Sequence, residues 1–324
     1  MRIFVSKNIA DTGLKLLEGA GFSVTVNEEN RDLTQQELIE ICQSFDALLS
    51  AGKHEIDKEL LEKCKHLKGI ALHSVGYDHV DLEMANKLKI PIGNTPEVLD
   101  KSTSDIAFLL MLAVSRNAIF KYEKIKKGEW EYANLTEDLG VELYGKTLGV
   151  FGLGRIGYQM AKKCAAAFDM KIIYHNRGKN KEAEKGLNAM YVPFDELLRQ
   201  SDVLSVHANL SAETEGIFNA DVFSQMKPSS IFINTARGGF HNEEDLIGAL
   251  ESRSIWGAGL DVTNPEPMDK DNPLLGMPYV CVLPHIGSAT VETRNAMSEL
   301  AAKNLIAALN NKKMPHIVNP EVYN

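Results

Sequence analysis

Three side chains late in the chain are of types that perform acid–base chemistry on a carbonyl compound: Arg237, Glu266 and His285. They follow IFINTA, WGAGLDVTNP and YVCVLP, three expected strands of one sheet, whose carboxyl ends are where open α/β sheets bind ligands. Arginine has a planar fork that binds a carboxylate and polarises a neighbouring carbonyl. Histidine donates protons near neutral pH, and a glutamate beside it orients the ring and favours its protonated form. The set therefore suits the reduction of a 2-keto acid.

Each of the three residues also has a structural interpretation when it is taken alone. A histidine at a strand end is more often hydrogen-bonded structure, an arginine in RGG can simply border a turn, and a glutamate before proline is usually solvated. Their joint placement at three successive strand ends carries the catalytic hypothesis.

A glycine-rich run, FGLGRIG, places Gly152, Gly154 and Gly157 in GxGxxG order between the expected strand TLGVF and the expected helix RIGYQMAKKCAAAF. In this setting the motif predicts a dinucleotide site. The first glycine permits a tight turn, the second lets the backbone approach a pyrophosphate, and the third allows the helix to pack on the strand. We expect the amides of Arg155 and Ile156 to face the phosphates. The alternative is a glycine-rich turn without a ligand.

The end of the next expected strand, KIIY, indicates which dinucleotide is preferred. An NAD site usually shows an acidic residue there, to accept a hydrogen bond from the ribose 2′-OH. This chain has His175, Asn176 and Arg177, with Lys179 and Lys181 close behind. Arginine holds the 2′-phosphate of NADP through charge-assisted hydrogen bonds. The pattern favours NADP over NAD, and the alternative is a solvated basic turn.

The elements around these residues alternate between short apolar runs and amphipathic segments, which predicts an α/β fold with two mainly parallel sheets. The first set runs from residue 1 to about 95, and the second begins at KTLGVFG. Between them, residues 104 to about 126 are predicted to form a helix that is buried, either between domains or at a subunit interface, because IAFLLMLAVSRN is apolar nearly all round. A long helix over ATVETRNAMSELAAKNLIAALNN closes the chain.

Composition and charge limit the other classes of function. The chain has 324 residues, 44% hydrophobic and 24% charged, enough for two domains. A net charge of −9 gives no basic surface for nucleic acid. The four cysteines lack the spacing of a metal site or a disulfide framework. No metal is therefore expected. Neither a signal peptide nor a membrane span is indicated, so a cytoplasmic protein is expected.

Several longer stretches in this order and spacing resemble the D-isomer-specific 2-hydroxyacid dehydrogenase family over almost the whole chain. They are SVGYDHVDLEMANK, NTPEVLDKSTSDIAFLLMLAVSR, GKTLGVFGLGRIG, INTARGG, GLDVTNPEP and LPHIGSAT. The resemblance implies a flavodoxin-like substrate domain over residues 1–98 and 290–324. It implies an inserted NAD(P)-binding Rossmann domain over residues 99–289, doubly wound like the first, with the site in the cleft between them.

The resemblance also implies roles for particular residues. The family's catalytic triad falls on Arg237, Glu266 and His285, and its coenzyme-binding residues include Asp261 and Thr235. The loop that binds the substrate carboxylate falls on Ser74, Val75 and Gly76. Within the family, TSDIAF and GVELYGKTLG are most similar to the glyoxylate, hydroxypyruvate and 2-ketogluconate reductases.

Two alternatives remain within the same fold. One is a non-catalytic interaction protein that senses dinucleotide, which the complete triad disfavours. The other is an NAD-dependent D-lactate or phosphoglycerate dehydrogenase, which the basic turn at Arg177 disfavours. A homodimer is expected because IAFLLMLAVSR is too apolar to be left in water and family members commonly associate through this region. Trp130 is expected near the neighbouring subunit.

Overall fold

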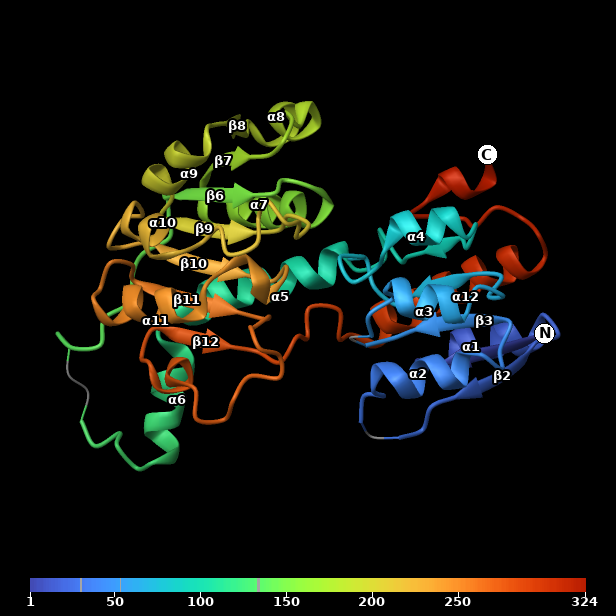
Figure 1. Ribbon diagram of the computed structural model, residues 1–324. Helices are drawn as coiled ribbons and strands as arrows, with labels where there is room; N and C mark the ends of the chain where they lie inside the picture. Colours follow the sequence, from blue (N-terminus) through green and yellow to red (C-terminus); the bar gives the residue numbers. More distant parts are fainter. Residues whose placement is uncertain (30, 53, 133–134) are drawn as a thin grey trace. The chain divides into compact units, whose positions relative to one another are not determined.

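The computed structural model describes residues 1–29, 31–52, 54–132 and 135–324. The chain forms two compact units, one of Met1–Leu99 with Ala289–Asn324 and one of Asp100–Ser288. Each unit is built on a parallel β-sheet with helices on both faces (Figure 1). The units are called unit 1 and unit 2 below.

The sheet of unit 1 has five parallel strands in the order β2-β1-β3-β4-β5. This is the flavodoxin-like order, in which the chain reverses direction across the sheet between β1 and β3. The strands are short and mostly buried because helices cover both faces. They are β1 (Arg2–Val5), β2 (Ser23–Val26), β3 (Ala47–Ser50), β4 (Ile70–Leu72) and β5 (Ile92–Gly93).

Two hydrophobic cores lie on the two faces of this sheet. One contains residues of the second, third and fourth helices, and the other contains residues of the first helix and the long C-terminal helix. Four of the helices begin at a threonine or aspartate whose side chain accepts a backbone N–H, which satisfies a donor that the first turn leaves free. The helices are α1 (Asp11–Gly19), α2 (Gln35–Cys42), α3 (Lys58–Lys63), α4 (Leu82–Lys87) and α12 (Val291–Leu309), with a 3-10 turn η3 (Pro320–Tyr323).

The C-terminal helix is tied to this sheet by a buried asparagine. The Asn304 side chain donates to the carbonyl of Asn94 over 2.9 Å and accepts the N–H of His316 over 3.0 Å. Both bonds are made by one fully buried amide, whose groups would be costly to leave unpaired. They join α12 and the tail to the segment after β5, although Asn94 and Asn304 are 210 residues apart along the chain.

The sheet of unit 2 has seven parallel strands in the order β12-β11-β10-β9-β6-β7-β8. Read from β8, this is the Rossmann order, and the reversal between β6 and β9 is where such sheets bind dinucleotides. The strands are β6 (Thr147–Phe151), β7 (Lys171–His175), β8 (Met190–Tyr191), β9 (Val203–Val206), β10 (Ile231–Asn234), β11 (Gly257–Leu260) and β12 (Val280–Val282).

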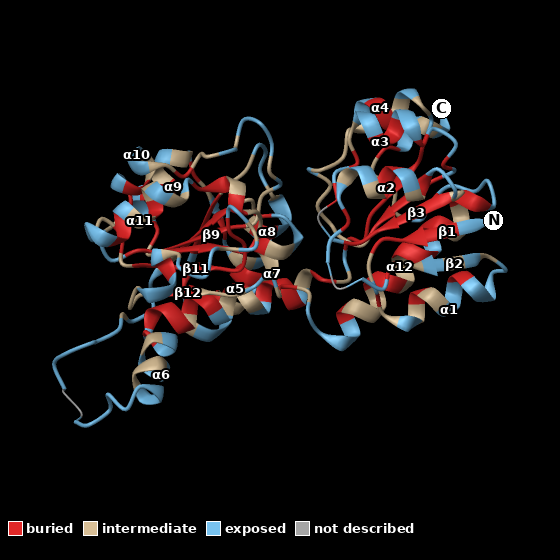
Figure 2. Cartoon of the chain, turned by 60° about the horizontal axis from the view of Figure 1, so that its bottom comes forward, coloured by how far each residue is buried: buried red, intermediate tan, exposed pale blue. Residues whose placement is uncertain are grey.

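Helices cover both faces of this second sheet, so its strands are buried while the outer helix faces stay exposed (Figure 2). One core packs against α5 (Asp100–Ser115), α7 (Arg155–Phe168) and α8 (Lys181–Leu187). The other packs against α9 (Phe194–Gln200), α10 (Ala220–Ser224) and α11 (Glu243–Glu251). The 3-10 turns η1 (Gly238–Phe240) and η2 (Pro273–Gly276) lie in the connections.

The single helix predicted over residues 104–126 is wrong. The structure has α5, which begins four residues earlier at Asp100, and a separate α6 (Ala118–Lys126). Asn117 separates them because its φ of 52° lies in the left-handed region, which ends a right-handed helix. None of the α6 residues is buried.

Among the residues that the structure describes, no single helix is both long and apolar enough to cross a membrane. The pair α5 and α6, bent by 65°, reaches that length and composition only when its two members are counted together.

Candidate active site

The central contact of the candidate site joins His285 and Glu266. The ring Nδ1 of His285 lies 2.7 Å from Oε1 of Glu266. Both follow the carboxyl ends of neighbouring strands, β12 and β11. The histidine side chain is 45% exposed and the glutamate side chain 21% exposed. The carboxylate therefore fixes one ring nitrogen and leaves Nε2 for a reacting group.

Asp261 holds the backbone that carries this histidine. It follows β11, is 1% exposed, and accepts the N–H groups of Ile286 and Gly287, each over 2.8 Å. His285 itself has a φ of 54°, a left-handed conformation that is unfavourable for a residue with a Cβ. Burial raises the pKa of the Asp261 carboxyl, although the two amides act in the opposite direction. The aspartate expected to bind coenzyme thus also shapes the turn that carries His285.

Arg237 lies on a turn whose backbone is held by the Asn234 side chain. The fully buried Asn234 side chain accepts the N–H of Ala236 over 3.0 Å and donates to the carbonyl of Arg237 over 2.8 Å. The same amide nitrogen lies 3.1 Å from Nδ1 of buried His241. Burial lowers the pKa of His241 to about 4, so this ring is neutral and Nδ1 accepts the amide proton.

The arginine turn packs directly on the segment that leads to Glu266. A Cβ added at Gly238 would collide with the carbonyl oxygen of Thr263 and would lie 2.9 Å from the N of Asn264. Glycine at this position lets the two backbones touch. Unit 2 therefore brings the turns that carry all three triad residues to one edge of its sheet, as the strand order requires.

The glycine-rich loop has the geometry of an anion site. Gly152 has a φ of 93°, and a Cβ there would clash with the backbone of Ala208. A Cβ at Gly157 would lie 2.7 Å from the carbonyl oxygen of Gly152, so helix α7 packs tightly on the loop. Among the described residues, none would lie within 4 Å of a Cβ at Gly154, and none caps the helix that begins at Arg155 with its side chain. The N–H groups of its first turn are thus available to a phosphate.

The turn after β7 contains the residues expected to select the dinucleotide. Arg177 is exposed. Asn176 is half-buried, accepts the N–H of Leu153 over 2.6 Å, and donates to the carbonyl of Leu153 over 3.3 Å. The amide at position 176 is therefore bonded to the glycine-rich loop, and Arg177 is an exposed cation beside it, as are Lys179 and Lys181.

Thr235, expected among the coenzyme-binding residues, directly follows β10. Its side chain is buried, and Oγ1 has no hydrogen-bond partner among the residues that the structure describes. A buried hydroxyl without a hydrogen-bond partner costs free energy, unless another group forms a hydrogen bond with it. Together with the uncapped helix and the open face at Gly154, it shows that the residues present fit a dinucleotide.

In unit 1, the loop of residues 74–76 follows β4, and its carbonyls are all bonded to the protein. Ser74 O accepts the N–H of Thr95 over 2.9 Å, Val75 O accepts Asn94 Nδ2 over 2.8 Å, and Gly76 O accepts Ser74 Oγ over 2.8 Å. In a trans peptide the N–H points opposite to the carbonyl. The amides of Val75 and Gly76 therefore face away from these donors, as an anion-binding loop requires.

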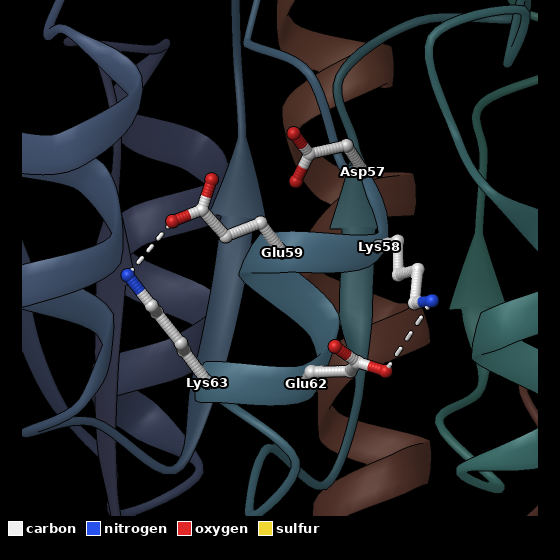
Figure 3. Close-up of a pocket in the computed structure, with 5 residues that line it drawn as sticks. All are labelled: Asp57, Lys58, Glu59, Glu62 and Lys63. Carbon is white, nitrogen blue, oxygen red and sulfur yellow. Dashed lines mark hydrogen bonds and ion pairs between the residues drawn. The ribbon is translucent and has the colours of Figure 1, made fainter.

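A shallow surface depression on α3 contains none of the candidate residues (Figure 3). It is lined by Asp57, Lys58, Glu59, Glu62 and Lys63. Its two lysines are paired along the helix, with Lys63 Nζ 2.7 Å from Glu59 Oε1 and Lys58 Nζ 3.9 Å from Glu62 Oε1. Exposed pairs of this kind contribute little and indicate a solvated helix face.

Comparison with known proteins identifies the class to which this fold and site belong. Residues 108–287 match the model of the D-isomer specific 2-hydroxyacid dehydrogenase, NAD binding domain. The protein is an oxidoreductase that uses a nicotinamide dinucleotide. The chain belongs to the D-isomer specific 2-hydroxyacid dehydrogenase family, as its sequence motifs indicated.

Relatives match along nearly the entire chain. A glyoxylate reductase of Thermococcus litoralis is 40% identical, with 99% of this chain and 97% of that protein covered. A glyoxylate/hydroxypyruvate reductase B of Escherichia fergusonii is 39% identical, with 99% and 98% covered. The crystal structure of an NADPH-dependent glyoxylate/hydroxypyruvate reductase from Sinorhizobium meliloti, in complex with NADP and malonate, has a TM-score of 0.83 at 32% identity, with 99% of this chain and 97% of that chain covered.

Two asparagine side chains that hold the backbone of the candidate site were not predicted from the sequence. Asn234 and Asn180 contact backbone groups of the arginine turn and of the glycine-rich loop. A polar residue just before or after the chemistry-bearing turn was the available signal in both cases, in INTARGG and in NRGKN. Such a signal is weak, because asparagine is common in turns of every kind.

The neutral histidines of unit 2 predict how its stability depends on pH. Burial lowers the pKa of His207 to about 3 and that of His241 to about 4. In the unfolded chain both take up a proton near the usual histidine pKa of about 6.5. The free energy of unfolding should therefore fall as the pH drops from about 6.5 toward 4, by up to about 1.4 kcal/mol per pH unit for each histidine.

The variant His241→Asn removes one of these titrating groups. Its free energy of unfolding in urea, measured at several pH values between 7 and 5, should show a shallower dependence than that of the wild type. Equal slopes for the two proteins would mean that His241 is not held neutral by the fold.

Proposed function

We propose that the protein reduces small 2-keto acids of the glyoxylate and hydroxypyruvate type to D-2-hydroxy acids, with NADPH as the preferred coenzyme and NADH as the alternative. The observation that carries the proposal is the His285–Glu266 pair at 2.7 Å beside the Arg237 turn. The relatives named above are reductases of these two acids, which supports the substrate class. Reduction of 2-ketogluconate, a larger acid, is a further candidate activity.

Arg237, His285 and Glu266 have distinct roles in the proposed reaction. Arg237 binds the substrate carboxylate through its fork and polarises the adjacent carbonyl. His285 donates the proton from Nε2 to the carbonyl oxygen, while Nδ1–H remains bonded to Glu266. The glutamate holds the ring through this hydrogen bond. When bound, the reduced nicotinamide supplies the hydride that the keto carbon accepts.

The other candidate residues bind and orient the two ligands. We assign the amides of Val75 and Gly76 in unit 1 to the substrate carboxylate, which makes unit 1 the substrate domain. Unit 2 is the coenzyme domain, in agreement with the family model that covers most of it. We assign Gly152, Gly154, Arg155, Ile156 and Gly157 to the diphosphate. Thr235 and Asp261 are assigned to the remainder of the dinucleotide.

The NADPH preference is supported by what the turn after β7 contains and what it lacks. No carboxylate stands at position 176 to repel a 2′-phosphate, and Arg177 is exposed beside it. The crystallised relative from Sinorhizobium meliloti is described as NADPH-dependent and holds NADP. A charge-assisted hydrogen bond from arginine to phosphate supplies the proposed selectivity.

We also propose a homodimer of cytoplasmic location. The apolar segment of α5 supports this only in part, because most of its apolar side chains are buried within unit 2 and Leu109 is its large side chain that stays exposed. Further exposed apolar side chains lie on α6 and on the segment that follows. They include Ile119, Tyr122, Ile125, Trp130, Tyr132, Leu135, Leu139 and Tyr144.

A group of large exposed apolar side chains is typical of a protein–protein interface. Sedimentation at micromolar concentration should show a dimer, and the variant Tyr122→Glu should weaken it by placing a charge in the interface. A stable wild-type monomer at that concentration would contradict the proposal.

The substrate class is tested by steady-state kinetics with a panel of 2-keto acids and both coenzymes. Glyoxylate and hydroxypyruvate should give the highest kcat/KM with NADPH, and pyruvate and phosphohydroxypyruvate much lower values. A preference for pyruvate or phosphohydroxypyruvate with NADH would instead identify a D-lactate or phosphoglycerate dehydrogenase. Coenzyme binding without turnover of any acid would indicate a non-catalytic protein.

The proposed proton donor is tested by His285→Ala. A positioned general acid contributes roughly a hundredfold or more to the rate, so kcat should fall by at least that factor. Coenzyme affinity, measured by fluorescence titration, should be retained because Nε2 acts on the substrate oxygen. Near-normal turnover would remove this assignment.

The variant Arg237→Lys should also lower kcat/KM severely, because a point charge cannot reproduce the planar fork of the guanidinium group.

The coenzyme assignment is tested by Arg177→Ala. Loss of one charge-assisted hydrogen bond, worth about 1.5–3 kcal/mol, should weaken NADPH by roughly tenfold to a hundredfold and leave NADH unchanged. Lys185→Ala, which removes an exposed charge from the nearby helix α8, is the matched control. If the wild type already prefers NADH, Arg177 is a solvated turn residue.

A further inference from the structure

Two asparagines after β7 bond to both backbone groups of Leu153, the residue between Gly152 and Gly154. Asn176 Oδ1 accepts the Leu153 N–H over 2.6 Å, and Asn176 Nδ2 donates to the Leu153 carbonyl over 3.3 Å. Asn180 Nδ2 donates to the same carbonyl over 2.9 Å. The two peptide planes around the middle of the glycine-rich loop are thus held by side chains more than twenty residues away along the chain.

Asn180 is itself fixed by other groups. Its side-chain oxygen accepts the N–H of Ala183 over 3.1 Å and so caps helix α8. Its own N–H donates to the hydroxyl of Tyr174 over 2.7 Å, and that hydroxyl donates to Glu184 over 2.9 Å. Tyr174 is fully buried in β7. Strand β7, the turn and the start of α8 are therefore joined to the glycine-rich loop as one hydrogen-bonded group.

The loop needs such support for a physical reason. Glycines on both sides of Leu153 leave the backbone with more accessible conformations than any other residue type would. An anion site built from backbone amides requires those amides to be aimed before the ligand arrives, because ordering them on binding reduces the affinity. The Leu153 side chain is buried and anchors one point of the loop, while its peptide groups are oriented by the asparagines.

We propose that Asn176 and Asn180 are positioning residues that preorganise the glycine-rich loop for the coenzyme diphosphate and couple it to the turn that carries Arg177. The inference rests on the proposed coenzyme function of unit 2 and deepens it. Affinity for the diphosphate and recognition of the 2′-phosphate then depend on one hydrogen-bonded group rather than on two separate sites.

Asn180→Ser separates this role from helix capping. Serine retains an oxygen that accepts the Ala183 N–H but is too short to donate to Leu153. Asn219→Ser is the matched control, because Asn219 caps α10 in the same unit by accepting the N–H of Val222 over 3.1 Å. The probes are ADP, which has a diphosphate and no 2′-phosphate, and adenosine 2′,5′-bisphosphate. Dissociation constants are measured by calorimetry and melting temperatures in parallel.

Asn180→Ser should raise the dissociation constants of both probes by roughly threefold to tenfold, because one hydrogen bond is lost. The KM for coenzyme should rise by a similar factor with kcat little changed. Asn219→Ser likewise keeps an oxygen that caps its helix, so both variants should change the melting temperature little, and Asn219→Ser should leave both dissociation constants within about twofold.

Three results would overturn the proposal. Unchanged binding of both probes to Asn180→Ser would reduce Asn180 to a helix cap. Weakened bisphosphate binding with unchanged ADP binding would show that Asn180 acts on the turn alone. A wild type that binds neither probe would remove the coupling together with the coenzyme site. A wild type that binds ADP better than the bisphosphate would refute the NADPH preference only, and the loss of ADP affinity in Asn180→Ser would still support the proposal.

Discussion

The hydrogen bond between His285 Nδ1 and Glu266 Oε1 is the interaction on which the proposed chemistry depends. It exists only if the turns after β11 and β12 bring the two side chains to within 2.7 Å. One of those turns must hold His285 at a φ of 54°, which costs about 1–2 kcal/mol for a residue with a Cβ. The two N–H bonds to buried Asp261 are of the charge-assisted kind, worth about 1.5–3 kcal/mol each, and they offset that strain.

Elsewhere in the molecule, short polar side chains near strand ends likewise hold the backbone of a neighbouring turn. Asn234 holds the carbonyl of Arg237, Asn176 holds Leu153 in the glycine-rich loop, and Asn94 holds the carbonyl of Val75 in unit 1. In each case an amide satisfies a backbone group of the neighbouring turn, so the turn has one preferred conformation. Rigid sheets thus set the positions of the loops, and single side chains set the orientation of their peptide groups.

The sequence predicted the parts of this account that rest on local patterns. The glycine motif between a strand and a helix indicated the Rossmann unit, and the strand order β8-β7-β6-β9-β10-β11-β12 confirms that fold class. The break at Asn117 was missed because apolar residues continue on both sides of it and asparagine alone is a weak signal. The two-residue strand β8 was missed because it is too short to show a period. The bonds of Asp261 and Asn180 depend on tertiary placement, which no local pattern encodes.

A double-mutant cycle between His285 and Glu266, with kcat/KM for glyoxylate as the readout, tests most directly whether the two residues act as one catalytic unit. If Glu266 acts by holding and stabilising the imidazole, Glu266→Gln should lower kcat/KM sharply in the wild type and have little further effect in His285→Ala. The coupling between the two positions should then account for most of the loss in the single Glu266 variant. If the two substitutions instead lower kcat/KM by independent factors that multiply in the double variant, the histidine–glutamate pair is not the catalytic unit.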